Sequence, residues 1–311
     1  MSRAIGRTLM THKISLVVAT KDRPDDLRRL LDSLSAQTRR PDQVVVVDAS
    51  QEPVESVPSD FPELNTTYLQ HWPPSAAAQR NAGIKACTPE STLIGFVDDD
   101  AAFEPGSIER MLLFWESASA DTGGASFNLR NYKMPPGRWA KNSRLIDALG
   151  LYPRRPGGVA QSGWHSVFGE VGELLQTEWL PSGAVVWRAE LLVQHQFDEF
   201  FDGYSYLEDL DFSYTISRDH RLVVIPEAGF FHYASPAGRG KARQFGRVEA
   251  RNRFYFVRKH HLSSVRCAVA LGVRCVMTAA DGIGHLDTSM FARSVGNVEG
   301  VFGLFTARHS R

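Results

Sequence analysis

The sequence has few cysteines, no net charge and no long apolar run, and each shortage excludes a class of protein. Only three cysteines occur in 311 residues, too few and too widely spaced for a disulfide scaffold or a four-cysteine zinc site. Lysine plus arginine and aspartate plus glutamate number 35 each, which removes any bulk electrostatic case for nucleic-acid binding. We therefore expect a globular protein of a reducing compartment, with no nucleic-acid partner.

Membrane-spanning and secretory segments are also missing from the pattern. A spanning helix needs about 20 apolar residues, whereas the best candidate, 267–280, is shorter and contains Arg274. Residues 1–13 are basic but lack the apolar core of a secretory signal. We expect a cytoplasmic protein. Its C-terminal helices are candidates for peripheral contact with the inner face of the membrane, although packing against their own domain is the more frequent arrangement.

Short apolar runs alternate with stretches of helical spacing. The expected strands are 14–19, 44–47, 93–97, 185–187, 222–225 and 230–233, and the expected helices are 25–37, 75–86, 109–117, 208–218 and 245–280. Residues 127–172 are irregular, and so long a stretch is usually functional or mobile. Strand–helix–strand order predicts right-handed parallel crossovers, and hence an α/β fold.

Polar side chains follow three of these strands. Thr20 ends the first strand, Asp48 ends the second, and Asp98, Asp99 and Asp100 follow the third. Ligands of open α/β sheets bind outside the carboxyl ends of the strands, so these groups should surround one site. Adjacent carboxylates repel unless a cation intervenes, and their oxygens suit a hard divalent metal. A solvated acidic turn is the alternative for an isolated triplet.

Several motifs stand in the order typical of family 2 inverting glycosyltransferases with the GT-A fold. They are 17–23, 45–48, 78–83, 96–100, 179–184, 197–201, 208–211, Pro226 and His232. The chain resembles this family from about Ile14 to His260, and bacterial rhamnosyltransferase-like members most closely at 179–184. The resemblance implies a Rossmann-like GT-A domain, with a mixed, mainly parallel sheet flanked by helices.

The resemblance also implies a division of the chain. We expect a nucleotide-sugar-binding half at 12–120 and an acceptor-binding and catalytic half of the same domain at 121–236. Residues 237–311 are expected to form a helical C-terminal extension.

A metal and a donor are implied on one side of the site. Asp98, Asp100 and His232 are the expected ligands of Mn²⁺ or Mg²⁺, which would act as a Lewis acid toward the departing diphosphate. A lone histidine is more often a packed residue, and the family pattern reverses that expectation for His232. The nucleotide-sugar would contact Ala19, Thr20, Arg23, Asp48, Arg80, Asn81, Gly83, Asp98 and Asp99.

Inversion needs a base that takes the proton from the attacking hydroxyl. We assign Asp209 to this role, with Glu208 beside it, at a helix start where the dipole and free amides stabilise carboxylates. Helix capping alone is the alternative for both acids. On the acceptor side the resemblance implies Trp179, Gly183 and Asp211.

Two positions depart from the family pattern. Thr215 stands where an arginine is common, which removes a supporting contact near the catalytic helix, and Arg218 is the candidate replacement. Asp219 stands where glycine is common, a mild change because aspartate tolerates the left-handed conformation.

The expected function is transfer of a sugar by single displacement in glycan or glycoconjugate biosynthesis. The donor would be a UDP-hexose or a dTDP-deoxyhexose, and the acceptor a hydroxyl of a saccharide, a lipid-linked compound or a small molecule. A sugar nucleotidyltransferase is one alternative, but it generally has a glycine-rich loop after the first strand, and 20–24 contains no glycine. A catalytically silent nucleotide- or carbohydrate-binding module is the other, and it would have no chemical need for Asp209 and His232.

Overall fold

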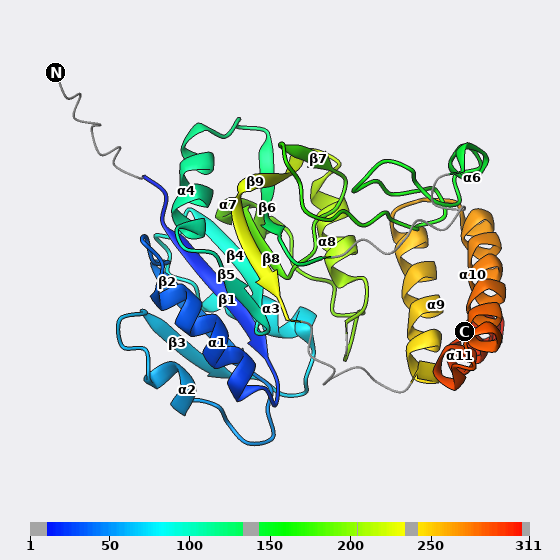
Figure 1. Cartoon of the computed structure of the whole chain (residues 1–311), viewed down its shortest axis with the longest axis horizontal. Helices are drawn as coiled ribbons and strands as arrows, with labels where there is room; N and C mark the ends of the chain where they lie inside the picture. The colour runs from blue at the N-terminus through cyan, green and yellow to red at the C-terminus, as the bar shows by residue number, and fades with distance from the viewer. Residues whose placement is uncertain (1–10, 133–142, 204, 234–241, 307–311) are drawn as a thin grey trace.

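The structure is a computed structural model that describes residues 11–132, 143–203, 205–233 and 242–306 (Figure 1). A nine-stranded sheet forms its centre, in the order β3-β2-β1-β4-β8-β6-β9-β5, and β7 pairs with β9 outside that path. Helices lie against both faces of the sheet, and three further helices gather at one end of the molecule. The expected α/β class, with a mixed and mainly parallel sheet, is confirmed.

The N-terminal half supplies the parallel part of the sheet. Its strands are β1 (Ile14–Thr20), β2 (Gln43–Asp48), β3 (Thr66–Gln70) and β4 (Leu93–Asp98). The connecting helices are α1 (Pro24–Ser35), α2 (Ser56–Ser59) and α3 (Ala76–Ala86). The valines of β2 are fully buried because helices cover both faces, as expected for an unbroken apolar run. The carboxyl ends of β1 and β4 therefore open side by side.

The second half of the sheet is mixed. Its strands are β5 (Ala101–Phe103), β6 (Thr122–Leu129), β7 (Leu175–Thr177), β8 (Ala184–Arg188) and β9 (Arg221–His232). β8 runs antiparallel between β4 and β6, and β6 runs parallel to β9. The helices of this half are α4 (Ser107–Ser117), α6 (Arg144–Ala148), α7 (Ala189–Gln194) and α8 (Glu208–Ile216).

The two strands expected at 222–225 and 230–233 are one strand, β9, which continues through Pro226. Its register against β6 shifts between Ser126 and Asn128, so several β9 residues bulge opposite Phe127. Proline is tolerated there because the bulge requires no ladder N–H from it. The Asn128 amide donates to the Pro226 carbonyl at 3.0 Å, which satisfies the irregular backbone.

Three helices form the C-terminal extension: α9 (Ala242–Lys259), α10 (Ser264–Gly284) and α11 (Thr288–Thr306) (Figure 1). The single helix expected at 245–280 is broken at His261, which has φ +54°, and restarts at Ser263, whose side chain caps α10. α10 is longer than the 267–280 segment, and its length and composition alone would allow it to cross a membrane. This is weak evidence for a span, because soluble helices pass the same test.

Candidate functional site

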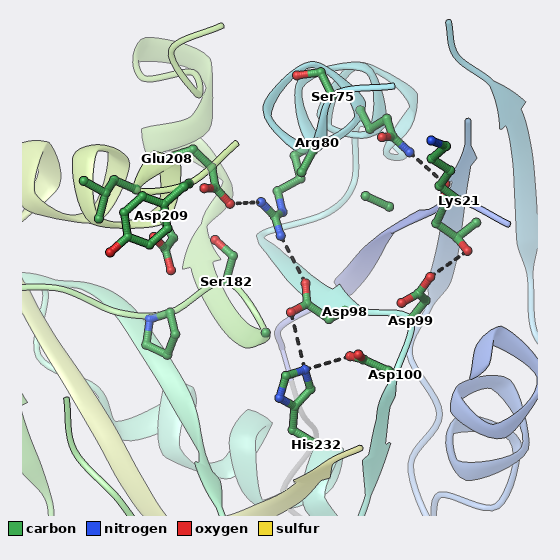
Figure 2. A pocket seen from close by; sticks show the side chains of 18 of the residues that line it. Lys21, Ser75, Arg80, Asp98, Asp99, Asp100, Ser182, Glu208, Asp209 and His232 are labelled. Atoms are coloured by element: carbon green, nitrogen blue, oxygen red, sulfur yellow. Dashed lines mark hydrogen bonds and ion pairs between the residues drawn. The ribbon is translucent and has the colours of Figure 1, made fainter. Parts of the chain in front are cut away.

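A cavity of about 690 Å³ opens at the carboxyl ends of β1 and β4 (Figure 2). The wall nearest the parallel strands includes Ala19, Thr20, Lys21, Arg23, Ser75, Gln79, Arg80 and the three aspartates, and we call it the donor wall because most of the predicted nucleotide-sugar contacts lie on it. The wall across from it includes His165, Trp179, Ser182, Gly183, Tyr206, Leu207, Glu208 and Asp209, and we call it the acceptor wall because the acceptor is predicted on this side. The cavity thus collects polar groups from segments nearly two hundred residues apart in the sequence.

Asp98, Asp100 and His232 form a candidate metal centre on the donor wall of this cavity. One ligand atom from each lies within 4.8 Å of the others. His232 Nε2 is 2.7 Å from Asp100 Oδ1 and 3.9 Å from Asp98 Oδ2. The hydrogen bond to Asp100, with the charge of Asp98, raises the pKa of His232 although burial opposes the shift. Two carboxylates and one imidazole fit Mn²⁺ or Mg²⁺.

Asp99 has a different environment from its two neighbours in the triplet. Its side chain turns toward the end of β1 (Figure 2). Thr20 Oγ1 donates to it at 2.8 Å and Arg23 Nη1 donates to it at 3.1 Å. Burial raises its pKa to about 6, against the effect of Arg23. The triplet therefore divides into two residues that face the histidine and one that links β4 to the end of β1.

Arg80 bridges the two walls. Its buried guanidinium donates from Nη2 to Asp98 Oδ1 at 3.1 Å and from Nη1 to Glu208 Oε1 at 2.6 Å (Figure 2). The same group lies over the ring of Phe197, 5.5 Å from its centroid. Arg80 thus connects one of the candidate metal ligands, Asp98, directly to Glu208 of the Glu208–Asp209 pair.

Glu208 and Asp209 begin α8 after a strained turn. Leu207 and Ser205 have φ of +76° and +53°, the left-handed region, which costs about 1–3 kcal/mol for such residues and often marks functional sites. Burial raises the pKa of both acids; the charge of Asp209 adds to the shift at Glu208, and Arg80 opposes it. The carboxylate of Glu208 accepts a hydrogen bond from Arg80. Among the described contacts, the Asp209 carboxylate accepts a hydrogen bond only from the amide of Leu210, in the first turn of the same helix, at 2.7 Å.

Three residues expected to bind the donor do not line the cavity. Both carboxylate oxygens of Asp48 accept hydrogen bonds from the protein, from Ser50, Val54 and Tyr68. Asn81 bonds the main chain of Phe197 and the carboxylate of Glu199. Gly83 faces β1, and a Cβ there would lie 2.2 Å from Val17 Cγ1, so glycine allows α3 to approach the sheet closely. Their roles toward a ligand stay predictions.

The acceptor-side predictions also divide. Trp179 and Gly183 line the cavity, and Trp179 donates its indole N–H to the Ser166 carbonyl at 3.0 Å. Asp211 is buried outside the cavity, where it accepts from Lys259 Nζ at 2.7 Å and bonds His260 Nε2 at 2.8 Å. Arg218 bonds Tyr214 at 3.4 Å and lines no part of the cavity.

Sequence reasoning missed several lining residues. Gln79 lies within the 78–83 motif, and its amide donates to the carbonyls of Thr20 and Val47 at 3.0 and 2.8 Å, joining the ends of β1 and β2. Its position in that motif was a usable signal. Tyr206 and His165 carry no such signal, because tertiary contacts alone bring them to the cavity.

Comparisons with known proteins agree with this architecture. The protein named "Uncharacterized glycosyltransferase YwdF" from Bacillus subtilis (strain 168) is 28% identical over 240 residues, which cover 75% of this chain and 79% of that protein. A shorter stretch of 63 residues is 44% identical to "Galactofuranosyltransferase GlfT1" of Mycobacterium tuberculosis (strain ATCC 25618 / H37Rv), covering 19% of this chain and 20% of that one.

Two solved structures share the fold. The mannosyltransferase PcManGT from Pyrobaculum calidifontis, in complex with GDP-Man and Mn²⁺, has a TM-score of 0.55 at 15% identity and covers 94% of this chain and 89% of its own. S. aureus TarS 1-349 in complex with UDP has a TM-score of 0.53 at 19% identity, with coverage of 87% and 74%. The family model described as "Glycosyl transferase family 2" matches residues 15–171, just over half of the sequence. The chain therefore belongs to glycosyl transferase family 2, and it is a glycosyltransferase.

Proposed function

We propose that the protein is a metal-dependent inverting glycosyltransferase, which moves a sugar from a nucleoside diphosphate to a hydroxyl group by a single displacement. One observation carries the proposal: Asp98, Asp100 and His232 converge on one wall of the cavity while Asp209 lines the other. An inverting reaction requires this separation, because the leaving group and the attacking hydroxyl occupy opposite faces of the sugar.

The residues divide the chemistry between them. Asp98, Asp100 and His232 would hold Mn²⁺ or Mg²⁺, which supplies Lewis-acid stabilisation to the departing diphosphate. Lys21 and Arg23 line the same wall and provide positive charge for phosphate oxygens. Asp209 takes the proton of the acceptor hydroxyl. At the same time the hydroxyl oxygen forms the new bond to the sugar, and the bond between the sugar and the diphosphate breaks. The raised pKa of Asp209 makes its carboxylate a stronger base.

The division of labour along the chain follows from the same proposal. Residues 12–120 bind the nucleotide-sugar, 121–236 bind the acceptor and carry the base, and 237–311 form the helical extension. We propose a UDP-hexose or a dTDP-deoxyhexose as the donor, as in rhamnosyltransferase-like enzymes, and a saccharide, lipid-linked or small-molecule hydroxyl as the acceptor in polysaccharide or glycoconjugate synthesis. The UDP complex of TarS supports a uridine nucleotide, and the GDP-Man complex of PcManGT adds guanosine donors to the test.

We further propose that the enzyme works in the cytoplasm, with α10 against the inner face of the membrane. Support comes from a stripe of exposed valines at 265, 269, 273 and 276 on this helix. Co-sedimentation with vesicles of phosphatidylglycerol and phosphatidylethanolamine tests this contact. A Val269→Asp, Val273→Asp variant should lose co-sedimentation and keep its enzymatic activity.

A thermal-shift screen of UDP-, GDP- and dTDP-sugars tests the catalytic proposal, because a ligand of the native state raises the melting temperature by mass action. One class of donor should stabilise the protein, and only in the presence of Mn²⁺ or Mg²⁺. The anomeric configuration of the product, read by proton NMR before mutarotation, should be inverted relative to the donor. Stabilisation that is independent of metal, or retention of configuration, would contradict the proposal.

A further inference from the structure

Arg253, on α9, is a buried charged residue outside the cavity. Its side chain is 1% exposed, and its guanidinium donates from Nη1 to the Gly163 carbonyl at 2.5 Å and from Nη2 to the Tyr206 hydroxyl at 3.2 Å. The guanidinium also lies over the ring of Trp164, 4.1 Å from its centroid. One side chain of the extension therefore contacts two separate segments that approach the acceptor wall.

Tyr206 is the more consequential of these contacts. It lines the cavity and precedes Leu207, the left-handed residue that leads into Glu208 and Asp209. α9 holds it at three points. Arg253 bonds the hydroxyl, the Asn252 amide donates to the main-chain carbonyl at 2.7 Å, and the ring packs edge-on against Phe245 at 4.9 Å. The strained turn before the catalytic acids is thus fixed largely from outside the catalytic half.

The second segment approaches α9 closely as well. Gly163 has φ +79°, and a Cβ there would lie 2.5 Å from Val257 Cγ2. The loop that carries Trp164 and His165 therefore packs directly onto α9, and His165 and Trp179 contact each other with ring centroids 4.4 Å apart. Arg253 consequently spans the gap between two parts of the acceptor wall.

Stability alone does not require an arginine at position 253. A buried charge carries a desolvation cost, and a methionine of similar length would fill the space without it. Glu249 on the same helix is 2% exposed and forms its ion pairs with Arg293 at 3.0 Å and Arg274 at 3.8 Å, so it offsets the charge of Arg253 only in part. What a methionine could not supply is a planar fork of donors that fixes two acceptors in defined directions.

We propose that Arg253 is a positioning residue, which holds Tyr206 and thereby fixes the turn that directs Asp209 into the cavity. The inference rests on the proposed function, in which Asp209 is the base. It assigns the C-terminal extension a role in turnover, because α9 supplies the contacts that keep a strained segment in one conformation. Asp209 itself acts on the substrate, and Arg253 acts only through Tyr206.

The test measures donor hydrolysis, in which water replaces the unidentified acceptor. Release of nucleoside diphosphate from UDP-glucose, UDP-galactose, GDP-mannose and dTDP-rhamnose is followed with Mn²⁺ for the full-length protein. Arg253→Met should lower kcat by about 100-fold and Arg253→Lys by about 10-fold, since small displacements of a catalytic group have effects of this size. The KM for the donor should not change, because the donor wall is untouched.

A matched control lies on the same helix. Arg247 is exposed and pairs with Glu299 on α11, so Arg247→Met removes an equal charge from α9 without touching the acceptor wall. It should leave kcat and KM unchanged. Tyr206→Phe removes only the hydroxyl that Arg253 contacts, and should lower kcat by about 10-fold at constant donor KM. This variant decides the question if Arg253→Met does not fold.

The outcomes separate the two proposals. Unchanged kcat in folded Arg253→Met and Tyr206→Phe overturns the inference, and so does a parallel change of kcat and donor KM, which indicates a general loss of structure. A kcat in Arg253→Lys that lies between those of Arg253→Met and the wild type supports the inference, because a residue that only fills space would not need an N–H hydrogen-bond donor. If the wild-type protein hydrolyses none of the four donors and none stabilises it, the proposed function fails first and the inference with it.

Discussion

The aspartates and Thr20 of the donor wall are positioned by strands of the sheet, whereas the turn of the acceptor wall is held in place from outside by α9. Asp98 and Thr20 end strands that pair in register, so their positions follow from the ladder between β1 and β4 and from its neighbours. Glu208 and Asp209 follow a turn in which Tyr206 lies between two left-handed residues, and side chains about 45 residues later in the sequence hold that turn.

The difference predicts how each wall responds to amino-acid substitution. A residue at the end of a buried strand is fixed by many backbone hydrogen bonds, so one side-chain deletion alters its chemistry more than its position. A residue in a strained turn keeps its position only while the surrounding contacts persist. Substitutions on the donor wall should therefore affect single functions, and substitutions around α9 should affect geometry.

The largest expected effect concerns the acid on the acceptor wall. Asp209→Asn should lower kcat by about 10²–10⁴-fold, the usual contribution of a general base, while donor binding measured by thermal shift persists. Asp219→Asn is the matched control, because Asp219 is exposed just beyond the same helix and should have wild-type kcat. Near wild-type kcat in Asp209→Asn would show that Asp209 is not the base and that its place on the acceptor wall is structural.

The next effect concerns the donor wall. Asp100→Asn should weaken Mn²⁺ binding by about 100-fold or more, since even partners of metal ligands contribute 10–100-fold. Isothermal calorimetry with Mn²⁺ alone measures this loss, and circular dichroism should show an unchanged fold. Asp60→Asn removes an exposed carboxylate paired with Arg28 and should bind Mn²⁺ as the wild type does. Equal affinity in the two variants would contradict a metal site on this wall.

A pair of glycine substitutions compares packing near the donor wall with packing in the extension. Gly83→Ala places a methyl group 2.2 Å from Val17 Cγ1 and should destabilise the protein by about 1–3 kcal/mol, the usual cost of overpacking. Gly272 lies in α10 with no atom within 4 Å of a Cβ, so Gly272→Ala should stabilise by about 0.5–1 kcal/mol. Urea unfolding measures both. Destabilisation by both substitutions would show that the extension is packed as tightly as the sheet.

The last comparison is a pH dependence of opposite sign on the two walls. Burial, with Arg253 nearby, lowers the pKa of His165 to about 3, and its Nδ1 has no hydrogen-bond partner among the described residues. The unfolded chain then binds a proton below about pH 6.5 that the native state does not, so stability falls by up to about 1.4 kcal/mol per pH unit on acidification toward pH 3. His165→Gln should flatten this slope in urea titrations between pH 6 and 4.

Asp99 on the donor wall acts in the other direction. Its pKa of about 6 exceeds that of an unfolded aspartate, so the native state binds the extra proton and gains stability as the pH falls from about 6 to 4. Asp99→Asn should therefore make the loss of stability on acidification steeper, whereas His165→Gln should make it shallower. Slopes that change in the same direction in both variants would contradict the environments assigned to the two groups.

The sequence was informative where local pattern decides structure. Buried strands predicted at 14–19, 44–47 and 93–97 are close to β1, β2 and β4, because short, mainly apolar runs followed by polar residues favour buried strands. Strand order then predicted that Thr20 and the aspartates would meet, and the structure brings them together with His232.

Prediction was weaker where tertiary contacts decide. Asp48 ends a strand as expected, but both of its carboxylate oxygens accept hydrogen bonds from Ser50, Val54 and Tyr68, which the sequence pattern does not predict. Hydrogen bonds from Arg80 to Asp98 and Glu208 join three positions that are far apart in the sequence, and no spacing in the sequence predicts them. β9 continues through Pro226 because of a bulge, whereas proline by itself predicts the end of a strand.

That bulge has a consequence for changes in chain length. His232 is aligned by pairing with Ala101, the residue directly after Asp100, so the ladder between β5 and β9 sets the approach of the two metal-ligand candidates. The bulge opposite Phe127 already accommodates unpaired residues of β9, and an insertion there need not shift the pairs beyond it. A deletion between 230 and 232 cannot be absorbed in this way, since a shift of the register by one residue would turn the side chains beyond it to the opposite face of the sheet. Insertions should therefore be tolerated within residues 225–228, and deletions after Phe230 should be rejected.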